Sequence, residues 1–354
     1  MANLITKIIP VSLKLKLAKL NDILNIYIPN RKKIQNTNKD IIYLMDTPTH
    51  SNLGDHAIAY AERVFCQKNF PDREIIEVPI PVFYEHIKFM KRHIKQGDVI
   101  CMVGGGNFGD LYLESETKKR IVCEIFKNNK IIIFPQTIWY SDTEQGNNEK
   151  KKTIKVLNAH KKLTVAARDR ESYKRATNLF DRTNVILVPD MVMYLHGDNS
   201  SDNIRKGILC CFRDDIEKNT YTDVEKIIEY FKKNKVDYTI TDTISSKGVS
   251  LGERFQSLQN KWIEFSNSKL VITDRLHGMI FSYITNTPCI ALDNSTHKIR
   301  DYYETWMKDV PYIVFLEQIE EILDLDIEKI KKSNVNMKEY FNILIKEIKN
   351  DSVK

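Results

Sequence analysis

The stretch Leu270-Val271-Ile272-Thr273-Asp274-Arg275-Leu276-His277-Gly278 runs from an apolar strand through a polar turn into a helix. Arg275 and His277 therefore emerge where a strand ends and a helix begins. The free N–H groups and the dipole of a helix N-terminus favour an anion. Arg275 adds a fixed charge, and His277 adds a group that exchanges a proton near neutral pH. A lone histidine is usually structural, but this pairing favours function, so we expect the turn to belong to an active site.

Short apolar runs alternate with helical patterns from about residue 40 onward. The runs expected to form strands are Ile41–Met45, Ile75–Val78, Val99–Val103, Ile131–Phe134, Leu163–Ala167, Val185–Val188, Gly207–Phe212, Val236–Thr241, Leu270–Thr273, Cys289–Leu292 and Tyr312–Phe315. The helical patterns lie near residues 56–69, 82–95, 114–128, 148–160, 170–180, 222–234, 256–267, 277–285, 298–308, 316–324 and 336–349. Strands that alternate with helices of this length predict βαβ units and mostly parallel sheets.

The alternation occurs in two series, which the polar stretch 196–205 separates. We therefore predict an α/β protein with two Rossmann-like, doubly wound domains, residues 36–195 and 196–354, that face each other across a cleft. Ligands of such sheets bind beyond the carboxyl ends of the strands. The polar stretch 142–152 is expected to be a surface loop. The six cysteines, none of them spaced as C-x-x-C, are expected to be buried thiols of a cytoplasmic protein.

The net charge of +7 is concentrated near the N-terminus, because residues 1–40 hold eight basic and two acidic side chains. Nucleic-acid binding needs basic charge spread over a docking face, so we do not expect it. Residues 1–35 also carry a helical apolar stripe, formed by Leu13, Leu17, Leu20, Leu24 and Ile28. Such a basic amphipathic segment either contacts the inner face of an anionic membrane as a peripheral anchor or packs on the neighbouring domain. We expect neither a membrane-spanning helix nor a signal peptide.

A second polar loop, residues 47–56, follows the first expected strand. Pro48 and Gly54 disfavour a helix there, while Asn52 and Asp55 suit turn and cap positions. Asp55 is expected to cap the helix that begins at residue 56, to contact a ligand, or to do both. Asn52 and Gly54 lie where the same loop can reach that ligand.

A glycine run, Gly104-Gly105-Gly106 with Asn107, follows another expected strand. Together with Gly109 it satisfies G-x-G-x-x-G, a pattern typical of dinucleotide sites. The next strand leads to Gln136 and offers no acidic residue to hold a ribose, so we do not expect a nicotinamide cofactor. We expect the run to let backbone N–H groups approach an anion or a sugar, and Gln136 to bond the hydroxyls of the ligand.

Two more arginines, Arg168 and Arg213, also follow expected strands. A guanidinium at such a place can bind a carboxylate or a phosphate in a bidentate manner. The alternative for each is a surface pair with a neighbouring aspartate. The His, Cys and Asp residues lack the spacing of metal ligands, so we expect no metal and no cofactor.

In their order along the chain, these loops resemble the polysaccharide pyruvyl transferase family. The matching segments are Asn52-Leu53-Gly54-Asp55, Gly104-Gly105-Gly106 with Asp110, Phe134-Pro135-Gln136-Thr137, Arg168-Asp169 through Ser172, Pro189-Asp190, and Thr273-Asp274-Arg275-Leu276-His277-Gly278. Each segment is short, but the ordered set is specific, and the Arg-Leu-His core is the most diagnostic. The first forty residues lie outside the resemblance.

The resemblance implies a fold like that of GT-B glycosyltransferases, with phosphoenolpyruvate as donor and a saccharide as acceptor, either free or lipid-linked. The product would be a cyclic pyruvate ketal of an exopolysaccharide, a capsule or another cell-surface glycan. Asp55, Arg168, Arg275 and His277 match residues that are linked to activity in the family. Lys298 matches more loosely, after the strand that follows the Arg-Leu-His core.

The implied chemistry suits these residues. Phosphoenolpyruvate carries a carboxylate and a phosphate, for which Arg168 and Arg275 are the leading partners. We expect His277 to be the general acid, and Asp55 to deprotonate or orient the attacking hydroxyl. One alternative is a GT-B glycosyltransferase that uses a nucleotide sugar. Asp293 is a weak candidate for the residue that would bind the ribose of that nucleotide. The other alternative is a non-catalytic saccharide-binding protein.

Overall fold

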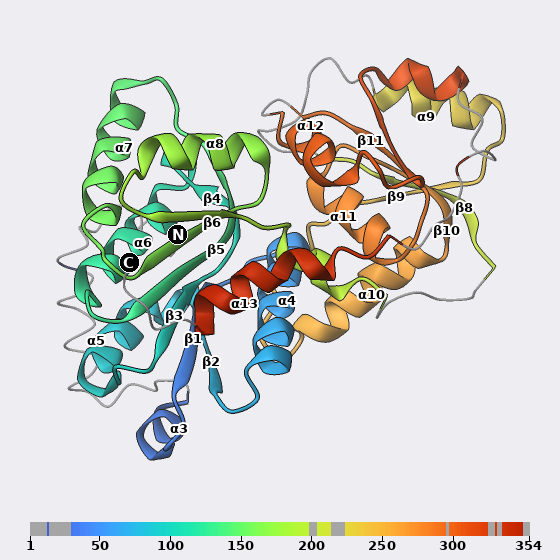
Figure 1. The fold of residues 1–354 in the computed structure, drawn as a ribbon. Helices are drawn as coiled ribbons and strands as arrows, with labels where there is room; N and C mark the ends of the chain where they lie inside the picture. Colours follow the sequence, from blue (N-terminus) through green and yellow to red (C-terminus); the bar gives the residue numbers. More distant parts are fainter. Residues whose placement is uncertain are drawn as a thin grey trace.

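The computed structural model describes Leu13 and residues 30–197, 204–213, 224–294, 297–324, 330 and 335–349. Its strands form two sheets (Figure 1). The seven strands of the first sheet are β1 (Ile41–Thr47), β2 (Glu74–Pro79), β3 (Val99–Met102), β4 (Gly105–Phe108), β5 (Lys130–Ile138), β6 (Leu163–Ala167) and β7 (Asn184–Leu187). The five strands of the second sheet are β8 (Lys206–Cys211), β9 (Tyr238–Thr241), β10 (Ser268–Thr273), β11 (Cys289–Leu292) and β12 (Ile313–Leu316).

Both sheets are parallel and have the same kind of strand order. The first runs β2-β1-β3-β5-β6-β7, with β4 paired to β5, and the second runs β12-β11-β10-β8-β9. The order therefore reverses once in each sheet, between β1 and β3 and between β8 and β10. At such a reversal the connections leave two adjacent strands toward opposite faces, which opens a crevice at their carboxyl ends. The predicted α/β class with doubly wound parallel sheets is confirmed.

Helices cover both faces of the first sheet and connect the strands of the second. The α-helices are α3 (Arg31–Asn36), α4 (Leu53–Asn69), α5 (Phe83–His93), α6 (Leu113–Ile125), α7 (Glu144–Leu157), α8 (Arg170–Leu179), α9 (Val224–Lys233), α10 (Arg254–Ser266), α11 (Leu276–Ile284), α12 (Lys298–Tyr302) and α13 (Asn342–Lys349). The shorter turns are η1 (Ile80–Val82), η2 (Asp110–Tyr112), η3 (Met191–Leu195), the π-turn η4 (Tyr303–Met307), η5 (Ile319–Asp324) and η7 (Lys338–Phe341).

Every expected strand is present, but three local expectations are wrong. Residues 142–152 are not a loop, because α7 begins at Glu144 and the Thr143 hydroxyl accepts the N–H of Gly146 at 3.0 Å. Asp55 is not the cap of its helix, because α4 begins at Leu53, one residue after its actual cap. The glycine run is not only a loop, because Gly105 and the residues after it form β4 against β5.

Successive residues of β1 pack on opposite faces of the first sheet. Ile42 and Leu44 belong to a core cluster with α4, whereas Tyr43 and Met45 belong to a cluster with α5, α6, α7 and α8. Figure 1 shows α5, α6 and α7 on the side of the sheet opposite α4. Burial on both faces is typical of parallel strands and leaves the strand ends as the place where polar residues gather. All six cysteines are free and buried, as expected.

The core cluster behind α4 continues into the second sheet, where α10 and α11 add Trp262 and Phe281. Each sheet and the helices that pack on it are called a unit below. Arg254, at the start of α10, is buried in the contact between these two units. Its Nη1 lies 2.6 Å from Glu77 Oε2 of β2, and its Nε donates to His56 Nδ1 of α4 at 3.2 Å. Burial lowers the pKa of His56 to about 4, so the ring stays neutral beside the guanidinium at physiological pH.

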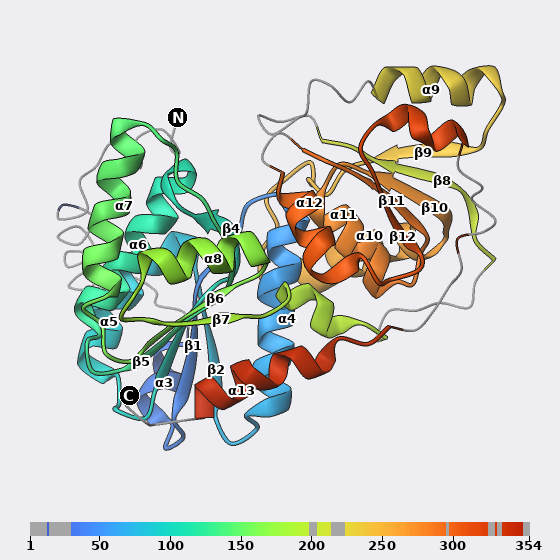
Figure 2. The ribbon, with the colours of Figure 1, turned by 45° about the horizontal axis from the view of Figure 1, so that its top comes forward.

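The last described helix returns to the first sheet. Phe341 packs against both Phe65 and Tyr194, and Leu344 lies in the same core cluster. Glu347 accepts a hydrogen bond from Thr164 Oγ1 at 3.0 Å. Figure 2 shows α13 alongside the lower end of α4, far from β8 to β12. The division into domains at residue 195 stays a prediction. α13 lies after that boundary and nevertheless packs on the first sheet.

Two predictions fall wholly or partly outside the described residues. The amphipathic segment 1–35 is described only at Leu13 and from residue 30 onward, so its membrane contact stays a prediction. The separating stretch 196–205 is described only at its two ends. Within the described ranges, no helix has the length and apolar character needed to cross a membrane.

Arg254 provides a test of the contact between the two units. We expect Arg254→Met to lower the free energy of unfolding by about 3 to 5 kcal/mol, because Glu77 loses its buried cationic partner. The control is Arg63→Met, since Arg63 is half exposed and lies 3.5 Å from the same carboxylate; we expect a loss below about 1 kcal/mol. Urea unfolding followed by circular dichroism measures both. Equal losses in the two variants would contradict this interpretation.

Candidate active site

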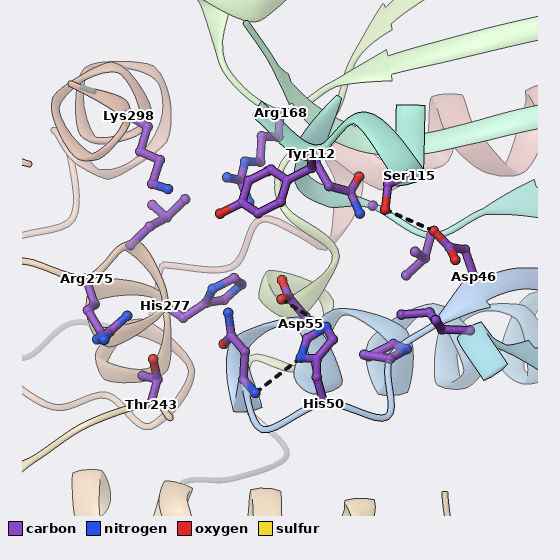
Figure 3. Close-up of a pocket in the computed structure, with 18 of the residues that line it drawn as sticks. Asp46, His50, Asp55, Tyr112, Ser115, Arg168, Thr243, Arg275, His277 and Lys298 are labelled. Atoms are coloured by element: carbon purple, nitrogen blue, oxygen red, sulfur yellow. Dashed lines mark hydrogen bonds and ion pairs between the residues drawn. The ribbon is translucent and has the colours of Figure 1, made fainter. Parts of the chain in front are cut away.

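A cavity of about 400 Å³ lies where the carboxyl ends of the two sheets face each other (Figure 3). Both strand-order reversals open into the cavity. The first does so at Asp46, near the carboxyl end of β1, and the second at Arg213, after β8. Nine of the predicted site residues line it: Asn52, Asp55, Gly106, Asn107, Arg168, Arg213, Arg275, His277 and Lys298. The cavity thus brings together side chains that are as far apart in the sequence as Asn52 and Lys298.

Three predicted residues, Gly54, Gly105 and Gln136, do not line the cavity. Gln136 is fully buried and donates from Nε2 to the carbonyl of Val103 at 2.7 Å, so it ties β5 to the end of β3. Gly105 has φ of 123°, a conformation that favours glycine. Gly54 lies directly against His277, because a Cβ at Gly54 would sit 2.3 Å from Nδ1 of the imidazole.

His277 lies in the first turn of α11, as the strand-to-helix pattern predicts. Its Nε2 is 3.8 Å from Asp190 Oδ2 and has no hydrogen-bond partner among the described residues. Burial lowers the pKa of His277, the Asp190 carboxylate opposes this shift, and the Arg168 guanidinium adds to it. The ring is therefore held in place by packing, and its buried Nε2 faces Asp190 at more than hydrogen-bond distance.

Arg168 follows β6 and is almost completely buried. Its Nη1 lies 2.9 Å from Asp190 Oδ2, and its Nε donates to Thr137 Oγ1 at 2.7 Å. The indole N–H of Trp306 donates to the carbonyl of Arg168 at 2.7 Å. The bonds to Asp190 and Thr137 fix the plane of the guanidinium, and the bond from Trp306 holds the backbone. Arg168 therefore presents its charge to the cavity in one orientation.

Asp190 joins Arg168 and His277. It belongs to the matching segment Pro189-Asp190, but we predicted no role for it. Its Oδ2 faces both Arg168 and His277, and its backbone N–H donates to Tyr302 Oη at 3.0 Å. Asp190 is 1% exposed. Its place just after β7 is the signal that could have identified it, because the other strand-end loops supply the remaining site residues.

The second sheet contributes two arginines that each engage an aspartate. Arg275 forms a two-point ion pair with Asp242, with Nε 2.5 Å from Oδ1 and Nη2 2.8 Å from Oδ2. The backbone N–H of Arg213 donates to Asp274 at 2.8 Å. Burial raises the pKa of Asp274 to about 6, which the nearby guanidinium groups of Arg213 and Arg275 partly oppose. Asp242 is a second residue that the sequence patterns did not reveal.

Asp55 approaches the cavity from the first sheet, in the first turn of α4. Asn52 caps this helix by accepting the N–H of Gly54 at 2.9 Å. The loop is tied to the other unit, because the N–H of Leu53 donates to the carbonyl of Thr243 at 2.8 Å. His50, which we did not predict as a site residue, places Nε2 3.6 Å from Asp55 Oδ2.

The cavity has two chemically different ends (Figure 3). Lys298 and Arg275 lie toward one end, Asp46 and Ser115 lie at the other, and Arg168 lies between them. His277 and Asp55 lie between the ends. Among the described residues, no group of His, Cys, Asp and Glu is arranged to hold a metal ion. The geometry suits a ligand with an anionic part at one end and a neutral, polar part at the other.

Comparisons with known proteins agree with this picture. Residues 52–296 match the polysaccharide pyruvyl transferase family. General stress protein 30 of Bacillus subtilis is 35% identical over 315 residues, which cover 86% of this chain and 90% of that protein. Pyruvyl transferase 1 of Schizosaccharomyces pombe is 29% identical over 291 residues, which cover 75% of this chain and 69% of that protein.

Solved structures with low sequence identity share the fold. An uncharacterized protein of Klebsiella pneumoniae aligns with a TM-score of 0.56 at 20% identity, covering 87% of this chain and 100% of that one. The UDP-GlcNAc 2-epimerase of Methanocaldococcus jannaschii aligns with a TM-score of 0.50 at 13% identity, covering 86% of this chain and 98% of that one. These likenesses confirm the predicted GT-B-like arrangement.

The position of Asp190 predicts how His277 titrates. We expect Asp190→Asn to lower the pKa of His277 further, because it removes the carboxylate that favours the charged ring. The titration of the imidazole Cε1–H by NMR, assigned with His277→Gln, measures this pKa. Glu304→Gln makes the same charge change at an exposed position outside the cavity, and there we expect no shift. A rise in the pKa of His277 in Asp190→Asn would contradict the assignment.

Proposed function

The chain belongs to the polysaccharide pyruvyl transferase family, and on that premise we propose that it transfers pyruvate from phosphoenolpyruvate to a saccharide as a cyclic ketal. The acceptor would be a precursor of an exopolysaccharide or another cell-surface glycan. The observation that carries the proposal is the cationic end of the cavity, which lies beside the imidazole of His277 and across from the carboxylate of Asp55. This arrangement matches a small donor with two anionic groups that must be protonated and then attacked by a hydroxyl.

The donor would lie at the cationic end. Phosphoenolpyruvate carries a carboxylate and a phosphate, and each needs a cationic or N–H partner. Arg168 and Arg275 are already oriented by Asp190 and Asp242, so little side-chain entropy is lost when the donor binds. Lys298, at the start of α12, adds a further cation at the same end.

The reaction then needs two proton movements that the central residues suit. His277 delivers a proton to the methylene carbon of the donor, which leaves an oxocarbenium-like centre at C2. A saccharide hydroxyl attacks C2 and releases its proton to Asp55, and the C2–O bond to phosphate breaks. A second hydroxyl attacks the same carbon, loses its proton and closes the ketal. One proton goes to the methyl group and one to the departing phosphate, which balances the two lost hydroxyl protons.

The lowered pKa of His277 fits this role once the donor is present. In the free protein, burial and Arg168 favour the neutral ring. A phosphate and a carboxylate bound beside the ring would favour its charged form. Binding of the donor would therefore favour protonation of His277 at the step that needs it. In the free protein the ring would stay neutral, which avoids the cost of a buried charge without a counter-charge.

The first activity test uses His277. We expect His277→Ala to reduce phosphate release from phosphoenolpyruvate at least about 100-fold, because the general acid is lost. The assay mixes the protein, phosphoenolpyruvate and a pool of lipid-linked oligosaccharides, and a parallel assay follows nucleotide release from nucleotide sugars. His93→Gln, in α5, is the control and should keep full activity.

Three outcomes would contradict parts of this proposal. Near-normal turnover of a folded His277→Ala protein would remove His277 as the acid. Nucleotide release without phosphate release would select a glycosyltransferase. Saccharide binding with neither release would select a non-catalytic binding protein.

A second test separates the position of His277 from its chemistry. We expect Gly54→Ala to lower turnover strongly, because the new methyl group would overlap the imidazole and displace it. The control is Gly252→Ala, since a Cβ at Gly252 meets nothing within 4 Å. Both variants should stay folded, as thermal unfolding can show. Equal turnover of the two variants would show that the contact between Gly54 and His277 does not position the acid.

A further inference from the structure

The end of the cavity opposite the arginines holds a polar cluster that the mechanism above does not use. It consists of the side chains of Asp46, Ser115 and Asn107, all of which line the cavity. Asp46 is the second-to-last residue of β1, which is buried throughout, and it lies at the strand-order reversal of the first sheet. In Figure 3 its carboxylate and the Ser115 hydroxyl point toward each other at the far end from Lys298.

Asp46 is held in a conformation that costs free energy. Its φ is 67°, which is unusual for a residue other than glycine. The register between β1 and β2 also shifts between Met45 and Thr47, so Asp46 lies at a bulge. Bulges beside functional sites re-aim a side chain. Here the bulge places the carboxylate at the cavity instead of in the core.

Two buried lysines of α6 stand behind this cluster. Lys118 Nζ lies 2.7 Å from Asp46 Oδ1, and both side chains are 2% exposed. Lys119 Nζ donates to the backbone oxygen of Asn107 at 3.0 Å and to its Oδ1 at 2.9 Å. Burial lowers the pKa of Lys119 to about 8, so it stays charged at neutral pH. The lysines face acceptors of the protein, and they orient the residues that line the cavity.

Once these contacts with the lysines are made, the amide of Asn107, the hydroxyl of Ser115 and the carboxylate of Asp46 still have positions that can bond the hydroxyls of a ligand. With both of its oxygens engaged by Lys119, Asn107 offers its amide nitrogen as a donor. Ser115 Oγ donates to Asp46 Oδ2 at 3.2 Å, so its oxygen can accept from a ligand, and the Asp46 carboxylate has further acceptor positions. Tyr112, 45% exposed, adds a ring at the rim that can cover the apolar face of a sugar.

We propose that Asp46, Ser115 and Asn107 form the acceptor subsite and bind a neutral pyranose, with Asp46 as a specificity-determining residue. This inference rests on the proposed function, because it takes the ligand to be the saccharide acceptor. The hydroxyls that react would face Asp55 and His277 in the middle of the cavity. The hydroxyls that do not react would face Asp46, which therefore selects their stereochemistry. Lys118 is a positioning residue that acts through Asp46.

The test measures saccharide binding without any donor. Saturation-transfer NMR would screen a panel of neutral methyl glycosides and short neutral oligosaccharides against the unmodified protein. We expect at least one to bind, and Asp46→Asn to weaken it at least about tenfold, because a hydrogen bond to a charged acceptor is lost. Ser115→Ala, which removes a smaller group, should weaken the same ligand. Phosphoenolpyruvate affinity, measured by calorimetry, should not change in either variant.

Lys118 adds a readout that separates positioning from folding. We expect Lys118→Met to weaken saccharide binding without changing phosphoenolpyruvate affinity, and Lys118→Arg to restore part of it. A loss of affinity for both ligands in Lys118→Met would assign Lys118 a purely structural role and overturn its positioning role.

Each result decides the inference independently of the donor. If no neutral saccharide binds, or if Asp46→Asn and Ser115→Ala both bind it as the unmodified protein does, the acceptor subsite is wrong. If saccharide binding depends on Asp46 but phosphoenolpyruvate neither binds nor reacts, the subsite stands and the proposed donor fails.

Discussion

The candidate site depends on one constraint, which is that the two sheets are held in a fixed relation to each other. His277 and Arg275 come from the second sheet, whereas Asp55 and Arg168 come from the first. The buried Arg254 at their interface bonds to both β2 and α4, and the core cluster around α4 is continuous with that of α10 and α11. A rotation of one unit against the other would break a buried ion pair and would also separate the acid from the base.

The same constraint explains the contact between Gly54 and His277. The first turn of α4 lies so close to the imidazole that only a hydrogen atom fits between them. The helix that presents Asp55 thus also forms a wall of the His277 pocket. Burial by this wall favours the neutral ring, and Asp190 keeps enough negative charge nearby for the ring to become charged when an anion arrives. The packing that joins the two units therefore also sets the acid–base chemistry.

Sequence patterns predict the strands, the class of fold and the strand-end loops well, because apolar runs and turn residues are local signals. Arg275 and His277 stand out for that reason. The roles of Asp190, Asp242 and Asp46 were not predicted, although Pro189-Asp190 was among the matching segments, because each role comes from the cation that the aspartate meets across the fold. β4 was missed because a glycine run has low strand propensity. The start of α7 was predicted at residue 148 instead of Glu144, because the first turn of this helix is polar. The cap of α4 was misassigned by three residues, since either Asn52 or Asp55 could have filled it.

The return of α13 to the first sheet has a consequence for biosynthesis. Phe341 and Leu344 fill the same core as Phe65, yet they leave the ribosome only after all of the second sheet has been made. Domains of most proteins complete their folding in the order of synthesis. Here the core beside α4 in the first unit is complete only when the second unit has been translated and α13 has been added. Until then the nascent chain exposes the apolar surface that Phe341 and Leu344 cover, and a chain that ends before residue 341 would leave that surface uncovered.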